Sequence, residues 1–434
     1  MKAIIHATLY DYQTFIQDGY ILFNDKIIET GPMTAFHQTD EMTIIDGTGH
    51  LVLPNFVNGH SHIYSTFARG IALPFAPKNF MDILTQIWWK LDGQLDLDMI
   101  FSSGIVSATD YIRHGVTTLI DHHASGTIKG SLETLKKAWV KEAGLRAILA
   151  FETSDRFDVD QAIKENRRFH EMNKTDRSRG LFGLHASLSL SDATLKKVRR
   201  NLDQIPIHIH VAESEMDQTL SLARHGMRVV ERLNAHGLLI PKSILSHAIH
   251  VNDAELDLIK ERDCVVAVNV TSNMNNAVGL PNIRRMREKN IPIIIGNDGI
   301  SRSMANEYLN VFYTAHLNDQ TPTDFTLNDL LDMIKETYRY ASDQFQVQLG
   351  SFEPKAEADL LMIPYQAPTP LHEKNIFGHL FYGLFHSFMP KHVFVKGEYV
   401  LRNYRVKKRL SNLYQTSSDV AQTLWDILAK EDLK

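Results

Sequence analysis

The sequence predicts an α/β fold: a (β/α)8 TIM-type barrel with a small composite β-sandwich domain formed by the N- and C-terminal segments. Three observations support this prediction. Apolar runs alternate with helix-length stretches from residue 51 onward, and both ends of the chain instead show the alternating pattern of antiparallel strands. The third observation is length, because 434 residues exceed the roughly 250–300 residues at which a single core stops growing.

Apolar runs mark the expected strands of the barrel. They span residues 51–58, 117–122, 146–151, 180–186, 206–213, 243–250, 264–270 and 292–298. Continuous apolar strands separated by helix-length segments are typical of a parallel sheet with crossover helices. The intervening segments 130–144 and 214–237 have helical periodicity and end at glycine. Eight strand-and-helix units predict a closed barrel rather than an open sheet.

The two ends of the chain predict one smaller domain, made where the chain leaves the barrel and returns to it. We expect a composite β-domain of residues 1–53 plus 350–404, a barrel of residues 54–349 and a C-terminal helical tail of residues 405–434. In the tail, Val420, Leu424 and Leu428 share one helical face. That face predicts that the helix packs against the rest of the protein.

Composition excludes several classes of function. The chain is 44% hydrophobic and 22% charged, and its net charge of −5 comes from interspersed signs, so neither a nucleic-acid nor a membrane partner is expected. The N-terminal segment lacks the apolar core of a signal peptide. Cys264 is the single cysteine, which permits no internal disulfide and fits a cytoplasmic protein. Because Cys264 lies in an apolar run, a buried structural thiol is expected.

Polar residues able to bind or serve a metal end four of the eight runs. His60 and His62 end the first run, and residues i and i+2 of a strand face the same way, roughly 6.6 Å apart. Two such imidazoles can each approach one metal ion at about 2.0–2.1 Å. The other three runs end in His208, His210 and Glu213, in His247 and His250, and in Asp298. Any one of these is more often a core or cap residue, but four at the same end of one barrel predict a joint metal site.

The motifs "PNFVNGHSH", "HASLSLS", "IHIHVAES", "SHAIHV", "NVTSNMNN" and "IGNDG", in this order, resemble the amidohydrolase superfamily. Within it, the chain is similar to the aminohydrolases that deaminate heterocyclic amines, grouped with triazine hydrolases and adenosine-type deaminases. The segments "IWWKLD", "LIDHHASGTIKGSLETL" and "FETSDR" resemble the SsnA-type aminohydrolases. The resemblance covers nearly the whole chain.

The resemblance implies a ligand set and a chemistry. It makes His60, His62, His210 and Asp298 the ligands of one divalent metal, with Zn²⁺ preferred and Fe²⁺ or Mn²⁺ as alternatives. It makes Glu213 the general acid/base and His247 the residue that orients the attacking water, with Asp298 part of the catalytic group. The implied reaction is attack of metal-bound hydroxide on an amino-bearing carbon of a small purine, pterin, pyrimidine or triazine-like ring, with release of ammonia. The protein would therefore be a hydrolase of carbon–nitrogen bonds other than peptide bonds.

Substrate contacts are expected from a second set of residues. The resemblance places His185 against the substrate. Trp88 and Trp89 follow the first strand, where they would either wall a planar ring or pack in the core. Asp92 loosely matches the position at which relatives that read a ribose carry a carboxylate. For His123, which ends the second strand, a substrate contact and a loop-fixing role both stay open.

Other readings stay open beside the leading one. The same hydroxide attack would also serve hydrolysis of another C–N or C–Cl bond on a triazine-like ring. A non-catalytic scaffold would show gaps in the ligand set, and the sequence has none. The run 180–186 offers no lysine to bridge two metals, which favours one metal, although Glu152 at the end of the third run is a candidate extra ligand. The resemblance leaves the possibility of a homodimer open.

Overall fold

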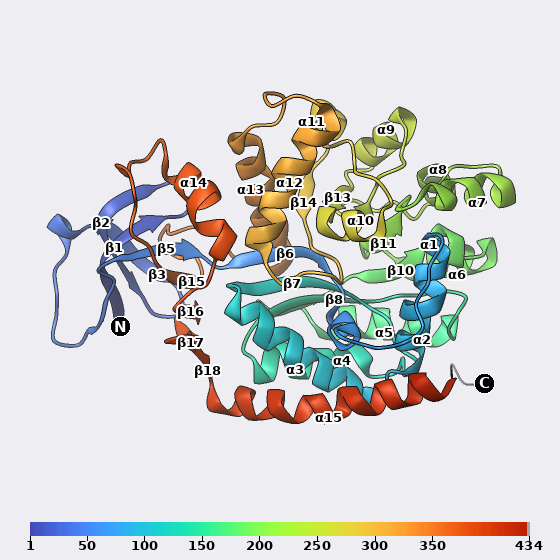
Figure 1. Cartoon of the computed structure of the whole chain (residues 1–434), viewed down its shortest axis with the longest axis horizontal. Coiled ribbons are helices and arrows are strands. Elements are labelled where there is room, and N and C mark those ends of the chain that lie inside the picture. The colour runs from blue at the N-terminus through green and yellow to red at the C-terminus, as the bar shows by residue number, and fades with distance from the viewer. Residues whose placement is uncertain (432–434) are drawn as a thin grey trace.

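The computed structural model describes residues 1–431 and has a mixed α/β fold (Figure 1). Two parallel sheets lie beside a larger sheet that contains both antiparallel and parallel strand pairs. The larger sheet occupies the left of Figure 1 and the parallel sheets with their helices occupy the right. No helix among residues 1–431 combines the length and apolar character needed to span a bilayer.

The larger sheet joins the two ends of the chain, as the alternating patterns predict. Its order is β18-β17-β16-β15-β5-β1-β2-β3, with β4 pairing with β1. The N-terminal strands are β1 (Lys2–Tyr10), β2 (Phe15–Phe23), β3 (Ile27–Pro32), β4 (Thr43–Asp46) and β5 (His50–Pro54). The C-terminal strands are β15 (Leu360–Pro364), β16 (His392–Val395), β17 (Glu398–Arg402) and β18 (Arg405–Val406). The antiparallel pairing of β5 with β15 closes the junction, with Leu53 opposite Leu361.

The predicted apolar runs form the strands of the two parallel sheets. One sheet has the order β6-β7-β8-β9 and the other β10-β11-β12-β13-β14. Their bounds are β6 (Phe56–Ser61), β7 (Val116–His123), β8 (Arg146–Phe151), β9 (Ser178–Gly180), β10 (Phe182–Ala186), β11 (Ile207–Val211), β12 (Ile244–His247), β13 (Val265–Val268) and β14 (Ile293–Ile295). The predicted strand 180–186 is divided at Leu181, and single parallel bridges, Thr153 to Leu184 and Ser61 to Asp298, connect the two sheets.

Helices cover the outer faces of these sheets (Figure 1). After the strands come α3 (Leu97–Arg113), α4 (Ser131–Lys136), η4 (Lys137–Glu142), α5 (Val159–Met172), α6 (Asp192–Leu202), α7 (Glu215–His225), α8 (Val229–Ala235), α9 (Asp253–Glu261), α10 (Val270–Asn276), α11 (Ile283–Glu288), α12 (Met304–Asp319) and α13 (Leu327–Phe345). Short polar side chains begin several of them: Asp96 accepts the Met99 N–H, and Asn252 forms a reciprocal capping box with Glu255.

The segment between β6 and α3 passes over the carboxyl ends of the strands. It contains η2 (Ile63–Ala68), α1 (Phe80–Ile83), η3 (Leu84–Trp88) and α2 (Trp89–Gln94). A second irregular segment follows β15 and contains α14 (Ile376–His379), η6 (Leu380–Leu384) and η7 (Phe385–Ser387). Two further short turns are η1 (Met33–Ala35) and η5 (Ser187–Ser189).

The C-terminal helix α15 (Lys408–Glu431) runs along α3 at the lower edge of Figure 1. It begins later than residue 405 because Arg405 and Val406 still pair with β17. Of the predicted apolar face, Leu424 and Leu428 are fully buried and Val420 is partly buried against the core. Of the predicted tail, residues 432–434 lie outside the described part of the chain.

Candidate active site

The carboxyl ends of β6, β11 and β14 bring together the predicted metal ligands, and the end of β12 adds His247. His60 Nε2 lies 3.5 Å from Asp298 Oδ1, and His62 Nε2 lies 2.9 Å from the same oxygen. The Nε2 atoms of His62 and His210 are 3.1 Å apart. One candidate donor atom from each of His60, His210, His247 and Asp298 falls within 4.8 Å of the others. These side chains are largely buried, and Asp298 is the most exposed of them at 9%.

Hydrogen bonds on the outer side of the rings fix their orientation. His62 Nδ1 donates to the carbonyl of His122 at 2.6 Å, and His210 Nδ1 donates to the carbonyl of His185 at 3.0 Å. His247 Nδ1 donates to the side-chain oxygen of Asn273 at 2.8 Å. A carbonyl or amide oxygen accepts only, so each Nδ1 carries a proton, and in the neutral form of each ring Nε2 presents a lone pair to the centre.

The centre of the cluster suits a cation. Two neutral imidazole nitrogens that both present lone pairs repel one another at the 3.1 Å separating His62 from His210, unless a positive charge lies with them. Burial opposes a charge on His62, but the negative charge of Asp298 outweighs it and raises the pKa of His62 to about 9. Burial lowers the pKa of His60 to about 3, and its Nε2 has no hydrogen-bond partner among the described residues. Three imidazoles and one carboxylate are a donor set that fits one divalent metal ion.

The short helix α10 supplies polar groups to this cluster. The Ser272 hydroxyl donates to Asp298 Oδ2 at 2.5 Å, and the Asn276 side-chain amide donates to Glu213 Oε1 at 3.4 Å. Glu213 also faces His247, with 3.6 Å between Oε2 and Nε2. Burial raises the pKa of Glu213, and the neighbouring His247 opposes this shift in part. The carboxyl group is therefore a stronger base than an exposed glutamate.

Backbone strain accompanies the placement of two of these side chains. His247 and Asp298 adopt left-handed conformations, with φ of 73° and 55°. The backbone N–H of Asp298 donates to the carbonyl of His60 at 3.0 Å, which holds the end of β14 against β6. Gly296 makes this approach possible, because a Cβ there would lie 2.6 Å from the backbone nitrogen of His60.

A second group of donor atoms overlaps the first. His62, His122, Glu152 and His210 each offer one atom within 4.8 Å of the others. Glu152 Oε1 lies 3.1 Å from His122 Nδ1 and 3.7 Å from His62 Nδ1. Because His210 belongs to both groups and His62 contacts Asp298 of the first, Glu152 would bind a metal at or beside the first group and not at a separate site.

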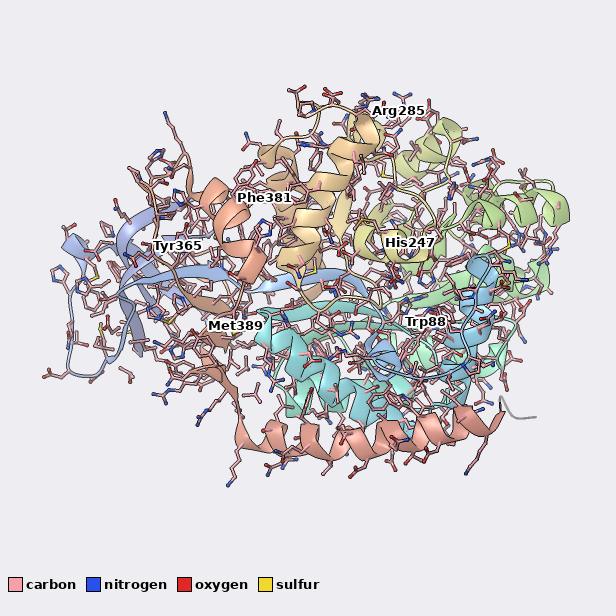
Figure 2. All side chains as sticks on the ribbon, viewed as in Figure 1. Trp88, His247, Arg285, Tyr365, Phe381 and Met389 are labelled. Atoms are coloured by element: carbon pink, nitrogen blue, oxygen red, sulfur yellow. The ribbon has the colours of Figure 1, made fainter. Side chains whose placement is uncertain are left out.

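A pocket opens above the cluster, with about 740 Å³ of empty space including the part open to solvent. Of the predicted substrate contacts, it is lined by His185, Trp88, Trp89 and Asp92. Figure 2 shows Trp88 and His247 in the same α/β part of the molecule. The indole N–H of Trp89 has no hydrogen-bond partner among the described residues.

Asp92 is engaged by a cation that the sequence did not single out. Arg156 forms a two-pronged ion pair with it, at 3.1 and 2.8 Å, and lies over the ring of Trp89. Burial nevertheless raises the pKa of Asp92 to about 6, with Arg156 opposing the shift. His123 is placed differently, since it is fully buried against Tyr64 and Phe151 and does not line this pocket in the described part of the chain.

Comparison with known protein families gives one decisive match. The amidohydrolase family profile matches residues 51–400, most of the chain and all of the strands that carry the cluster. The chain belongs to the amidohydrolase family.

Individual relatives of this amidohydrolase extend the comparison. It is 30% identical over 362 residues to a 5'-deoxyadenosine deaminase of Methanobrevibacter smithii, a match that covers 80% of each chain. Among solved structures, an adenosine deaminase from Xanthomonas campestris with bound zinc superposes with a TM-score of 0.82 at 20% identity, covering 97% of this chain and 98% of that one. An atrazine chlorohydrolase from Arthrobacter aurescens TC1, complexed with zinc, gives a TM-score of 0.79 at 19% identity, covering 97% and 100%. The two structural likenesses show the fold.

Several site residues of the amidohydrolase were not predicted from the sequence. Ser272, Asn273 and Asn276 all lie in "NVTSNMNN", which was noted as a motif without roles for its members. The available signal was a run of short polar residues directly after a buried strand, the position of catalytic loops in a barrel. Arg156 ends the motif "FETSDR" and its partner Asp92 ends "IWWKLD", but local spacing does not indicate their pairing because the two residues lie far apart in the sequence.

Proposed function

We propose that this amidohydrolase is a metal-dependent aminohydrolase that removes an amino group, as ammonia, from a small N-heterocycle. The observation that carries the proposal is the position of Glu213, whose carboxyl group, on a side chain 12% exposed, faces His247 beside the convergent ligand cluster and lines the pocket. Deaminase relatives support the same reaction class.

One divalent metal would be held by His60, His62, His210 and Asp298, the four residues assigned from the resemblance. Their Nε2 atoms and the Asp298 carboxylate are the convergent donors described above. A metal in such a site acidifies water, lowering its pKa from 15.7 to about 7, and zinc is the ion that this donor set favours.

Proton transfers fall to Glu213. Its burial-raised pKa lets it accept a proton from the attacking water and then deliver protons to the ring nitrogen and the departing amine. The Nε2 atom of His247, which has no hydrogen-bond partner among the described residues, faces the same space. When this nitrogen carries a proton, it stabilises the negative charge that develops on the attacking oxygen. The Asn276 amide holds the Glu213 carboxylate in place.

The pocket walls would hold the ring. Trp88 and Trp89 offer flat apolar surfaces suited to a planar heterocycle, and the unpaired N–H of Trp89 can donate to a ring substituent. His185 lies in β10 and lines the same pocket. Its Nδ1 is hydrogen-bonded to Ser189 Oγ at 2.6 Å, so its Nε2 is available to the substrate. Burial lowers the pKa of His185 to about 4, which keeps the ring neutral at physiological pH.

We also infer that the two parallel sheets close into one (β/α)8 barrel. The bridges Thr153–Leu184 and Ser61–Asp298 support closure at both seams. The composite β-domain would comprise residues 1–53 and 350–404 and curl into a sandwich, with the barrel at 54–349 and the tail at 405–434. Separate apolar clusters on the sheet, one around Phe23, Val52 and Phe394, support that division.

Metal analysis combined with an ammonia-release screen tests the proposal. The purified protein should contain about one metal per chain and release ammonia from one class among purines, pyrimidines, pterins and triazines. Metal without ammonia from any ring, but with release of chloride or an alkylamine from triazines, would replace deamination by that alternative. A protein that binds no metal after reconstitution would overturn the proposal.

A further inference from the structure

A second chamber adjoins the pocket that holds the proposed reaction. It has about 960 Å³ of empty space including the part open to solvent, and lies between the segment after η2 and the loop after β14. The chamber and the main pocket share the wall residues Ser65, Trp88, Asn276, Gly299 and Ile300. A substituent on a ring in the main pocket therefore has a neighbouring space to enter.

The chamber is cationic. Arg69 and Arg302 line it, and no acidic side chain is found in its lining within residues 1–431. Arg69 is more than half exposed and pairs with Asp110 at 2.9 Å, so its charge is partly compensated. Arg302 differs, because it is only 7% exposed and forms no ion pair within the described chain. A buried guanidinium without a carboxylate is costly, and such cations are normally paired.

The contacts of Arg302 leave its charge without a carboxylate and part of its hydrogen-bonding capacity unused, although its guanidinium also lies over the Tyr111 ring, 5.2 Å from the centroid. Nη2 donates to Ser65 Oγ at 3.0 Å, and Nη1 donates to the Ser301 carbonyl at 3.1 Å and, weakly, to the Tyr111 hydroxyl at 3.4 Å. All three acceptors are neutral. A guanidinium has five N–H donors, so two remain, and Nε is among the buried atoms without a partner. The charge of Arg302 acts to lower the pKa of Asp121, but the two side chains form no ion pair. The Asp121 carboxylate accepts the Ile63 N–H at 2.6 Å instead.

We propose that the second chamber is an anion subsite, and that the substrate is an N-heterocycle carrying a carboxylate or phosphate substituent that Arg302 binds. The planar fork of a guanidinium matches both oxyanions, and burial strengthens the interaction. Arg69 adds a second positive charge at the outer part of the chamber. The inference rests on the proposed function, because it places the ring in the main pocket.

A purely structural role for Arg302 would consist of its bonds to Ser65 and Tyr111, which hold the loop after β14 against η2 and α3. That role predicts equal damage to every substrate when Arg302 is replaced. An anion subsite predicts damage only for the ligands that carry the anion. The two roles are therefore separated by a comparison of ligand pairs rather than by loss of activity alone.

The test is calorimetric titration of the metal-loaded protein with two pairs of ligands, in a Glu213→Gln background that slows turnover. One pair is pterin and pterin-6-carboxylate, and the other is adenosine and adenosine 5'-monophosphate. The first pair tests binding of a carboxylate, and the second tests binding of a phosphate. Arg302→Gln is compared with Arg285→Gln, which removes an exposed charge paired with Asp253 at the outer edge of the molecule (Figure 2). Ammonia release is measured in parallel with Glu213 intact.

We expect the anionic member of one pair to bind more tightly than its neutral partner. Arg302→Gln should reduce that preference by about 10- to 100-fold, the effect of one or two charge-assisted hydrogen bonds, while the neutral member stays within about twofold. Arg285→Gln should leave the preference unchanged. If Arg302→Gln does not fold, Arg302→Lys should keep a reduced preference, because lysine retains the charge without the fork.

Three results would overturn the inference: equal affinity for both members of each pair in the wild-type pocket, equal losses for charged and neutral ligands in Arg302→Gln, or binding of no member of either pair. The reaction and the subsite fail separately. Ammonia release without an anionic preference retains the deaminase and rejects the subsite. An Arg302-dependent preference without ammonia retains the subsite and rejects the reaction.

Discussion

His62, His210 and His247 each have Nδ1 held by an oxygen acceptor, and this decides what the three rings can do. With the proton fixed on the outer nitrogen, the inner nitrogens are left as ligands or as acceptors. Asp298 is held in turn by Ser272, so the negative charge of the cluster has a fixed position. The hydrogen bonds made by Nδ1 of each ring, and by one oxygen of Asp298, therefore determine which nitrogen and oxygen atoms remain available at the centre of the site.

Replacement of Glu213 by glutamine should separate proton transfer from metal binding. The variant keeps the size of the side chain and the ligand set, so metal content should stay at the wild-type value while kcat falls by about 10²- to 10⁴-fold. Turnover and elemental analysis of the same preparation measure the two quantities. Glu215→Gln, two residues further along and exposed, is the matched control. Wild-type turnover in Glu213→Gln would remove this residue from the reaction.

Glu307 should make stability depend on pH. Burial raises its pKa from 4.5 to about 7, although the Thr271 hydroxyl and N–H donate to it. Between these values the folded state binds more protons than the unfolded state, so the free energy of unfolding falls as pH rises from about 4.5 to about 7. Glu307→Gln does not titrate and should lose less stability over this range, by up to about 3 kcal/mol. Urea unfolding of both proteins at pH 5 and pH 8 measures the difference, and parallel losses would contradict it.

At the scale of elements, α10 shows what the sequence could and could not predict. The strand-end residues His60, His62, His210 and Asp298 were predictable, because parallel strands must deliver their carboxyl ends to one edge. The contribution of α10 was not, since it depends on where a seven-residue helix places Ser272 and Asn276 relative to Asp298 and Glu213. Residues that pair across long separations in sequence, such as Asp92 with Arg156, escape any argument from local spacing.

The helix α15 should contribute measurably to stability through its apolar face. Leu424 is fully buried, so Leu424→Ala should lower the free energy of unfolding by about 2–5 kcal/mol, through lost burial and the cavity left behind. Lys430→Ala, at an exposed position of the same helix, should change it by less than about 0.5 kcal/mol. Thermal unfolding of both variants makes the comparison. Similar melting temperatures for the two would mean that the helix is not part of the cooperative unit.

At the scale of the whole molecule, one buried cation ties the composite sheet to the parallel strands. Arg146 at the start of β8 pairs with Glu357 at 2.6 Å and with Asp359 at 3.0 Å, just before β15. Trp139 donates to the Arg146 carbonyl at 2.9 Å, so the backbone of this residue is held as well. The two parts of the molecule therefore meet through charged groups as well as through apolar contacts.

Loss of this cation should destabilise the whole protein. Arg146→Met removes the buried cation between two buried carboxylates and leaves Glu357 with Lys26 at 3.4 Å and Asp359 with the Lys396 N–H at 2.7 Å. Loss of one partner costs about 3–5 kcal/mol in comparable buried pairs. Arg409→Met removes an ion pair with Glu142 whose arginine is 77% exposed, and should cost about 1 kcal/mol or less. Chemical denaturation of both variants measures the contrast. Equal effects would show that Arg146 is replaceable.

The pairing of β5 with β15 also sets an order of events during synthesis. β5 ends at Pro54 and β15 begins at Leu360, so at about 5–20 residues per second its partner emerges from the ribosome roughly 15–60 s later. Throughout that interval one edge of β5 has no strand beside it, and such edges recruit strands from other chains. Shielding of this edge by the ribosome or by a chaperone, until the last strands are made, would therefore limit pairing with other chains.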